Sequence, residues 1–110
     1  MTQIFVDGDG CPVKEEVYRV AKRYQLHVTF TANAWMHTPQ ADWFQFVLVS
    51  EQINAADDWI AEHVSSRDIV ITGDVPLAAR CLAKGAVVLD TRGGAFTEER
   101  IGSALATREL

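Results

Sequence analysis

Five short runs rich in β-branched residues, spaced along the chain, most constrain the fold that this sequence can adopt. They lie at residues 3–7, 27–32, 46–50, 68–72 and 86–90. None alternates strictly between apolar and polar residues, which is typical of strands buried on both faces. Stretches with helical periodicity predict helices at residues 13–24, 55–64, 75–83 and 98–107. Because strands and helices alternate, we predict an α/β fold, a three-layer sandwich with a mostly parallel central sheet.

The predicted helices carry recognisable start and stop signals. Pro12 opens the first helix, where its fixed φ suits the first turn, and Gly85 follows the third. Before the fourth helix, Thr97 is placed to act as the N-cap. Phe96 and Ile101 have the spacing of a hydrophobic staple across the first turn. These signals support the boundaries that the periodicity gives.

The length and composition suit one globular domain. The chain has 110 residues, 48% of them hydrophobic, and we assign the single domain to residues 1–110. No apolar run approaches the ~18 residues of a membrane span, and the amino terminus lacks the pattern of a signal peptide, so we expect a cytoplasmic protein. Cys11 and Cys81 are far apart in the sequence, which favours reduced packing residues over a disulfide or a zinc site.

Acidic residues follow several of the predicted strands. Asp7 ends the first strand and Asp9 lies two residues further on, while Asp74 follows the fourth strand and Asp90 ends the fifth. Asp57 falls in the first turn of the helix after the third strand. Ligands of open parallel sheets bind outside the carboxyl ends of the strands, where loops lead into helix amino termini. We therefore expect these acids to meet at one edge of the sheet.

Each acid taken alone also has a purely structural interpretation. Asp9 and Asp74 are placed to cap helices, and Asp57 is placed to form a capping box with Asn54, at about 1 kcal/mol per cap. Asp68 begins its strand, so it should point to the opposite edge of the sheet. Capping explains a single acid as well as a functional role does.

A cluster of carboxylates is harder to explain by capping. Two carboxylates about 4 Å apart near a surface repel by roughly 4 kcal/mol, which exceeds what a cap returns. Either a cation offsets this repulsion or one carboxyl stays protonated. Mg²⁺ or Mn²⁺ prefers oxygen ligands and often binds through one or two carboxylates plus substrate phosphates. We predict that Asp7, Asp57 and Asp74 bind such an ion and that Asp9 orients water or a second ion.

Several motifs together resemble the bacterial YaiI/YqxD family. They are "VDGDGCPVKEEVYRVAKR", "ANAWMHTP", "INAADDWI", "DIVITGDVPLAARCLAKGA" and "TRGGAFTEERI". This family is similar to the PIN-like nucleases, small α/β sandwiches with metal-binding acids at the carboxyl edge of the sheet. The resemblance spans nearly the whole chain and implies a PIN-like domain. It also implies four acids in the active site and two substrate contacts: Asp7, Asp9, Asp57, Asp74, Asn33 and Arg92.

The chain departs from the family pattern at a few positions. Asn54 stands where the family usually has aspartate, which weakens the acidic set, and Asp90 is a candidate to restore part of the lost charge. Gly8 and Gly10 replace alanines, and Thr91 replaces a proline. Members of the family tend to continue beyond the position of Leu110 with a glycine- and lysine-bearing tail, so by resemblance that tail is expected to be absent here.

Contacts with nucleic acid would have to be local. Ten basic and fifteen acidic residues give a net charge of −5, which excludes long-range attraction of a polyanion by the whole domain. Arg92, after a strand and before two glycines, is best placed to bind a phosphate; Lys14, Arg80 and Lys84 are further candidates. The loop at residues 33–43 holds two tryptophans, which either stack on bases, cover the sheet edge or meet a second subunit in a homodimer.

Three functions remain open at this point. The first is a Mg²⁺- or Mn²⁺-dependent nuclease or phosphodiesterase that acts on RNA or another phosphodiester. The second is a non-catalytic module that binds RNA, a nucleotide or a protein and keeps a degenerate metal site. The third is a phosphatase with Asp7 as nucleophile and Asp9 as acid, because "VDGDG" also resembles the Asp-x-Asp of haloacid-dehalogenase-type enzymes.

Overall fold

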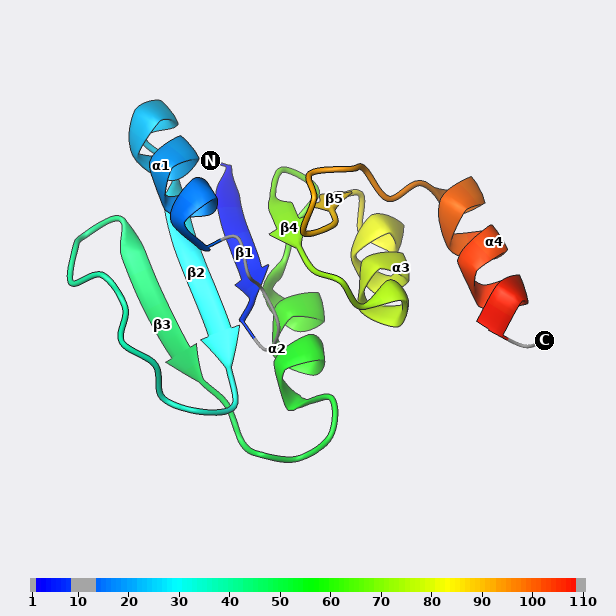
Figure 1. Ribbon diagram of the computed structural model, residues 1–110, viewed down its shortest axis with the longest axis horizontal. Coiled ribbons are helices and arrows are strands. Elements are labelled where there is room, and N and C mark those ends of the chain that lie inside the picture. Colours follow the sequence, from blue (N-terminus) through cyan, green and yellow to red (C-terminus); the bar gives the residue numbers. More distant parts are fainter. Residues whose placement is uncertain (1, 9–13, 109–110) are drawn as a thin grey trace.

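A computed structural model describes residues 2–8 and 14–108 (Figure 1). Asp9, Cys11 and Pro12, for which the sequence made predictions, lie outside the described residues. Nine elements follow one another along the chain. They are β1 (Gln3–Asp7), α1 (Lys14–Tyr24), β2 (His27–Ala32), β3 (Phe44–Leu48), α2 (Ala55–His63), β4 (Ile69–Ile71), α3 (Val75–Ala83), β5 (Val87–Leu89) and α4 (Glu98–Arg108).

The five strands form one sheet in the order β3-β2-β1-β4-β5, and every neighbouring pair is parallel. The predicted α/β class with a parallel central sheet is therefore confirmed. The longest helices, α1 and α4, have 11 residues each. Within residues 2–8 and 14–108, accordingly, no helix is long and apolar enough to cross a membrane.

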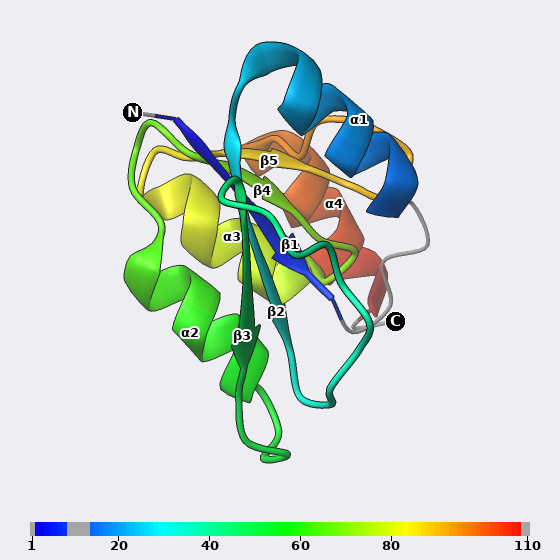
Figure 2. The same cartoon turned by 90° about the vertical axis from the view of Figure 1, so that its left-hand side faces the viewer.

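The sheet separates two hydrophobic cores. On one face, α1 packs over β1 and β2 through Val17 and Ala21. On the other face, α2 and α3 cover the sheet, and α4 packs outside α3 (Figures 1 and 2). Side chains alternate between the two cores along β1, where Ile4 faces α1 and Phe5 faces α2 and α3. The layers therefore follow from the period-two pattern of the buried strands.

The third strand begins two residues earlier than predicted. The run of β-branched residues favoured residues 46–50, whereas β3 spans Phe44–Leu48. Pairing with β2 decides the register, because Val28 lies opposite Phe44 and its N–H donates to the Trp43 carbonyl oxygen. The Phe44 ring is buried against Tyr18 and Phe30. Packing of this aromatic residue therefore outweighs local β propensity.

Two helix starts differ in how they are capped. The Thr97 hydroxyl accepts a hydrogen bond from the Arg100 N–H at 3.1 Å, which confirms it as the N-cap of α4. Asn54 precedes α2 in a left-handed conformation with φ of 67°, and its side chain makes no capping hydrogen bond. The predicted capping box between Asn54 and Asp57 is therefore wrong. Asp57 is left available to face the end of the sheet.

Gly8 is required by a close approach between two strands. Its N–H donates to the Thr31 carbonyl oxygen at 2.7 Å. A Cβ atom at this position would overlap the Phe30 ring and lie 2.9 Å from that oxygen. The Phe30 ring thus occupies the space that the family's alanine would need.

We expect Gly8→Ala to lower the free energy of unfolding by about 1–3 kcal/mol, because the added methyl group forces the Phe30 ring to move. Gly73→Ala is the matched control, since a Cβ there meets no atom within 4 Å, and it should change stability by less than about 1 kcal/mol. Urea denaturation measures both. The double variant Gly8→Ala/Phe30→Leu should lose less stability than the sum of the two single losses, because the smaller leucine leaves room for the added methyl group. A loss equal to that sum would contradict this account.

Candidate functional site

A polar pocket of about 270 Å³ opens at the carboxyl ends of β1 and β2. Figure 1 shows the loop between β3 and α2, which supplies residues 51–54, running past these strand ends. Three of the predicted acids and the predicted asparagine line the pocket together with residues 51–56. They are Asp7, Asn33, Asp57 and Asp74. The structure therefore brings together side chains from three strand ends and a helix start.

Thr72 connects two of these acids. Its hydroxyl donates to Asp7 Oδ2 at 2.9 Å and accepts a hydrogen bond from the Asp74 N–H at 3.0 Å. Thr72 itself is buried, with 1% of its surface exposed. One hydroxyl thus fixes the end of β1 relative to the turn that follows β4. Thr72 was not among the predicted site residues, although it lies two residues before Asp74, because nothing in the local sequence indicates a contact with Asp7.

Asp74 combines a structural role with a place in the pocket. Its Oδ1 atom accepts a hydrogen bond from the Leu77 N–H at 2.8 Å and so caps α3, which confirms the capping interpretation for this acid. Its carboxyl group also lies within hydrogen-bonding reach of Asp57. Because only one oxygen of Asp74 caps α3, the carboxylate is oriented by the cap and still lines the pocket.

The pocket raises the pKa of Asp57 to about 6. Burial of the carboxyl group is the largest cause, and the negative charges of Asp74 and Asp7 add to it. Arg80 opposes the shift only weakly, since its guanidinium forms an ion pair with Asp58 at 2.6 Å. Near neutral pH the pocket therefore holds carboxylates whose charge is not balanced by a nearby arginine. A bound cation would lower this pKa again.

A second threonine lies beside Asp7 without a partner. Thr31 is opposite Asp7 across the β1–β2 ladder and is fully buried. Its hydroxyl has no hydrogen-bond partner among the described residues. Burying a hydroxyl without a hydrogen-bond partner costs free energy, so Thr31 destabilises the fold at this position.

Asp90 and Arg92 do not join the pocket. Asp9 lies outside the described residues. Asp90 accepts hydrogen bonds from Arg100 at 2.7 Å and from the Arg92 and Gly94 N–H groups, which lower its pKa. It therefore does not replace the charge lost at position 54. Arg92 lines a separate groove, so the structure does not place this arginine with the acids.

The other candidate basic groups are engaged elsewhere. The Lys84 ammonium donates to the Ala61 carbonyl oxygen at 2.6 Å, and Arg80 pairs with Asp58. The Lys14 ammonium lies 5.4 Å from the centre of the Phe30 ring. The pocket is lined by no lysine, arginine or histidine from residues 2–8 and 14–108.

The tryptophans of the loop at residues 33–43 differ in exposure. Trp43 packs edge-on against Tyr18 and Phe44, which favours the interpretation that it covers the sheet edge. Trp35 follows Asn33 by two residues, and 73% of its surface is exposed. Ile53, which lines the pocket, is 90% exposed. Ile53 thus adds an exposed apolar side chain to the polar pocket, and Trp35 is a second exposed apolar side chain, two residues along the chain from Asn33.

The donor set suits a hard divalent cation with few protein ligands. No three His, Cys, Asp or Glu side chains of residues 2–8 and 14–108 are arranged to share one metal ion. Mg²⁺ does not require such a group, because it commonly binds one or two carboxylates and keeps several waters. All donors in the pocket are carboxylate or amide oxygens, which this ion prefers. The negative charges of Asp74 and Asp7, which add to the effect of burial on the pKa of Asp57, would also favour a positive charge there.

The fold and the pocket define a class of protein: a small open α/β domain with an all-parallel sheet and carboxylates gathered at its carboxyl edge. The chain belongs to the family described as "Uncharacterized BCR, YaiI/YqxD family", whose profile matches residues 5–110.

Relatives from several bacteria match the whole chain. A UPF0178 protein of Paramagnetospirillum magneticum is 53% identical over 110 residues, which are all of this chain and 73% of the relative. UPF0178 proteins of Gluconacetobacter diazotrophicus and of Rhodopseudomonas palustris strain TIE-1 are 48% and 49% identical over the same length, covering 71% and 70% of those relatives. No solved structure matches the chain.

Proposed function

We propose that this protein is a divalent-metal-dependent hydrolase of phosphodiesters, with RNA or another nucleic acid as its substrate class. The observation that carries the proposal is the pocket in which Asp7, Asp57 and Asp74 meet, because burial and mutual repulsion there raise the pKa of Asp57 to about 6. The cytoplasmic location expected from the sequence is part of this proposal.

In this proposal one or two of the carboxylates of Asp7, Asp57 and Asp74 would bind Mg²⁺ or Mn²⁺ directly, and the ion would keep several of its waters. When bound, such an ion polarises a phosphoryl oxygen and lowers the pKa of a coordinated water. Thr72 keeps Asp7 oriented by donating a hydrogen bond to its carboxylate, and the Leu77 N–H does the same for Asp74. Such preorganisation of the ligands by neighbouring groups is typical of metal sites.

The remaining predicted residues have unequal support. The Asn33 amide lines the pocket and is suited to hydrogen-bond a substrate oxygen. Asp9 lies outside the described residues, and the proposal keeps its predicted role of orienting water or a second ion. Arg92, predicted to bind a substrate phosphate, lines a different groove, so the proposal gives it no role in the pocket.

A non-catalytic binding module is the second candidate, and two observations favour it. Asp74 and Asp7 each use a carboxylate oxygen for a hydrogen bond within the protein. In addition, the acids of the described chain do not form a ready three-ligand group. In this alternative the pocket retains acids that cap and connect elements, while a partner binds at the exposed side chains nearby.

We expect calorimetric titration with Mn²⁺ and Mg²⁺ to detect binding to the wild type and at least about tenfold weaker binding to Asp7→Asn, the scale of effect typical of metal-site groups. Metal-dependent cleavage across a panel of single- and double-stranded RNA, DNA and nucleotides should fall in parallel. Asp74→Asn is informative because asparagine caps helices as well as aspartate does, so lost cleavage would report chemistry rather than unfolding.

Asp42→Asn, in an exposed loop, is the control and should behave like the wild type. Absence of ion binding at millimolar concentration, or equal binding by Asp7→Asn, would contradict the enzymatic proposal. Nucleic-acid binding without cleavage, unaffected by Asp74→Asn, would instead support the binding module.

A further inference from the structure

The two faces of the sheet are covered unequally. The β3-to-β4 and β4-to-β5 crossovers place α2 and α3 on one face, and α4 packs outside α3 on the same side. Only α1, the β1-to-β2 crossover, covers the other face, and it lies over β1 and β2. Figure 2 shows α1 on the opposite side of the sheet from α2 and α3. Over β4 and β5, the face that bears α1 is therefore covered by no helix of residues 2–8 and 14–108.

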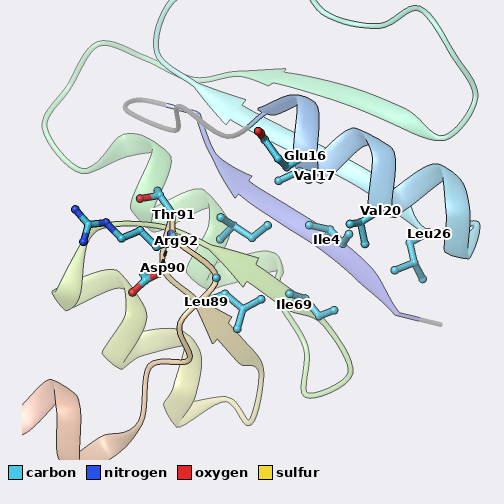
Figure 3. Close-up of a pocket in the computed structure, with 12 residues that line it drawn as sticks. Ile4, Glu16, Val17, Val20, Leu26, Ile69, Leu89, Asp90, Thr91 and Arg92 are labelled. Atoms are coloured by element: carbon cyan, nitrogen blue, oxygen red, sulfur yellow. Dashed lines mark hydrogen bonds between the residues drawn. The ribbon is translucent and has the colours of Figure 1, made fainter.

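A groove of about 530 Å³ lies on this face, between α1 and the ends of β4 and β5. Figure 3 shows Ile4, Ile69 and Leu89 from three adjacent strands along its floor and Val20 on the wall formed by α1. The other apolar residues that line it are Val17, Leu26 and Ile71. We call the surface made by these seven residues the α1–β5 groove.

The floor of the α1–β5 groove is a continuous apolar ribbon. Ile4 pairs with Ile69, and Ile71 pairs with Leu89, so neighbouring side chains lie on the same face. Val20 is 47% exposed, and Val87, opposite Ile69 on β5, is 54% exposed. Ile4, Val17 and Ile71 are already buried, so the exposed apolar surface comes from Val20 and Val87 and from the half-buried Leu26, Ile69 and Leu89. Both faces of a parallel sheet are normally covered, and within residues 2–8 and 14–108 no helix covers β4 and β5 on this face.

Polar groups lie at one end of the groove. Glu16, Thr91 and Arg92 lie at the carboxyl ends of the strands, whereas Leu26 and Ile69 lie at the other end (Figure 3). The Arg92 guanidinium points away from the apolar side chains, which leaves the floor uncharged. An element with an apolar stripe and a polar end would match this distribution.

The relatives extend beyond the part that these 110 residues match. Matches that span all 110 residues cover only 73%, 71% and 70% of the relatives of Paramagnetospirillum, Gluconacetobacter and Rhodopseudomonas. More than a quarter of each relative therefore lies outside the matched region. A segment of that length is ample for a helix of several turns.

We propose that the α1–β5 groove is the docking site of an amphipathic helix, and that in the relatives this helix comes from the segment outside the matched region. The β1-to-β2, β3-to-β4 and β4-to-β5 crossovers are formed by helices placed elsewhere, and the β2-to-β3 crossover contains no helix, so we place the covering helix outside the matched fold. Its apolar residues at positions i, i+3, i+4 and i+7 would lie along the strands of the floor. Docking would complete the third layer of the sandwich.

Isoleucine methyl NMR tests the proposal, because the six isoleucines divide into suitable groups. Ile4, Ile69 and Ile71 line the groove, while Ile60 and Ile101 lie in the opposite core. The 110-residue chain is compared with a fusion that carries the extra segment of the Paramagnetospirillum relative at the same end as in that protein. We expect shifts at the three groove methyl groups and reduced relaxation by a soluble paramagnetic probe at the half-buried Ile69, with Ile60 and Ile101 unchanged.

Peptides that span the same extra segment provide the matched mutational test. Binding in trans should weaken about tenfold or more in Val20→Asp, because the substitution buries an unpaired charge under the docked helix. Leu105→Asp, at an exposed apolar position on α4, should bind like the wild type. Unchanged groove methyl groups in the fusion, or equal peptide binding by Val20→Asp, would overturn the proposal. Concentration-dependent shifts of the groove methyl groups in the unfused chain would also overturn it, by identifying a second copy as the occupant.

Discussion

Replacing Asp57 by asparagine is expected to raise the free energy of unfolding at pH 7.5 and to remove the response of the fold to Mg²⁺. The folded protein raises the pKa of Asp57 from 3.8 to about 6, so the folded state binds this proton more tightly than the unfolded state does. The contribution of Asp57 to stability is therefore fully present below about pH 4 and is lost as the pH rises through about 6.

The size of the effect follows from the same pKa. Fully buried, a difference of this size would correspond to about 3 kcal/mol, and solvent screening of a partly exposed carboxyl reduces it to about 1–2 kcal/mol. Asparagine keeps the shape and cannot ionise, so the variant should gain this amount over the wild type at pH 7.5 and little at pH 4. Urea denaturation at a series of pH values measures the difference directly.

Glu62→Gln is the control, since Glu62 is exposed on the same helix and does not line the pocket. It should change the free energy of unfolding by less than about 0.5 kcal/mol and leave its pH dependence unchanged. With Mg²⁺ at a hundredfold excess over its Kd, the wild type should gain about 2.7 kcal/mol and Asp57→Asn should gain much less. An Asp57→Asn variant that is destabilised equally at pH 4 and pH 7.5 would mean that folding does not raise the pKa of Asp57.

The fold was largely predictable because its signals are local. Alternating strands and helices gave the α/β class, and Gly85 and Thr97 marked helix ends within a residue or two of their observed positions. Register is not local, however. The start of β3 depends on the burial of Phe44 against residues of α1 and β2, which no window of the sequence displays.

The candidate site was predictable where it depends on strand ends and not where it depends on the order of strands. Asp7 and Asp74 follow β1 and β4, which are neighbours in the sheet, so their convergence needed only parallel topology. Arg92 follows β5, the outer strand, about 10 Å from β1 at the usual spacing of strands. The position of β5 at the edge of the sheet comes from tertiary packing, which explains why a correctly placed strand end did not bring Arg92 to the pocket.

The contact between Thr72 and Asp7 leads to the second large prediction, which compares two chemically identical substitutions. Thr72→Val removes a hydroxyl that donates to Asp7 and accepts from the Asp74 N–H, whereas Thr31→Val removes a buried hydroxyl without a described partner. We expect Thr72→Val to lower the free energy of unfolding by about 1–3 kcal/mol, since it removes a hydrogen bond to the partly buried end of β1 and the side-chain acceptor of the Asp74 N–H.

Thr31→Val should have no cost or a small stabilising effect, because the lost hydroxyl is desolvated and makes no described compensating bond. Valine matches the shape of threonine in both cases, so volume cannot account for a difference between the two variants. Thermal denaturation gives the stabilities, and Mn²⁺ calorimetry should show weaker binding only for Thr72→Val, since only that change frees Asp7 to turn away. Equal losses from both substitutions would mean that burial of the strand ends, rather than the hydrogen bonds of Thr72, holds the acids together.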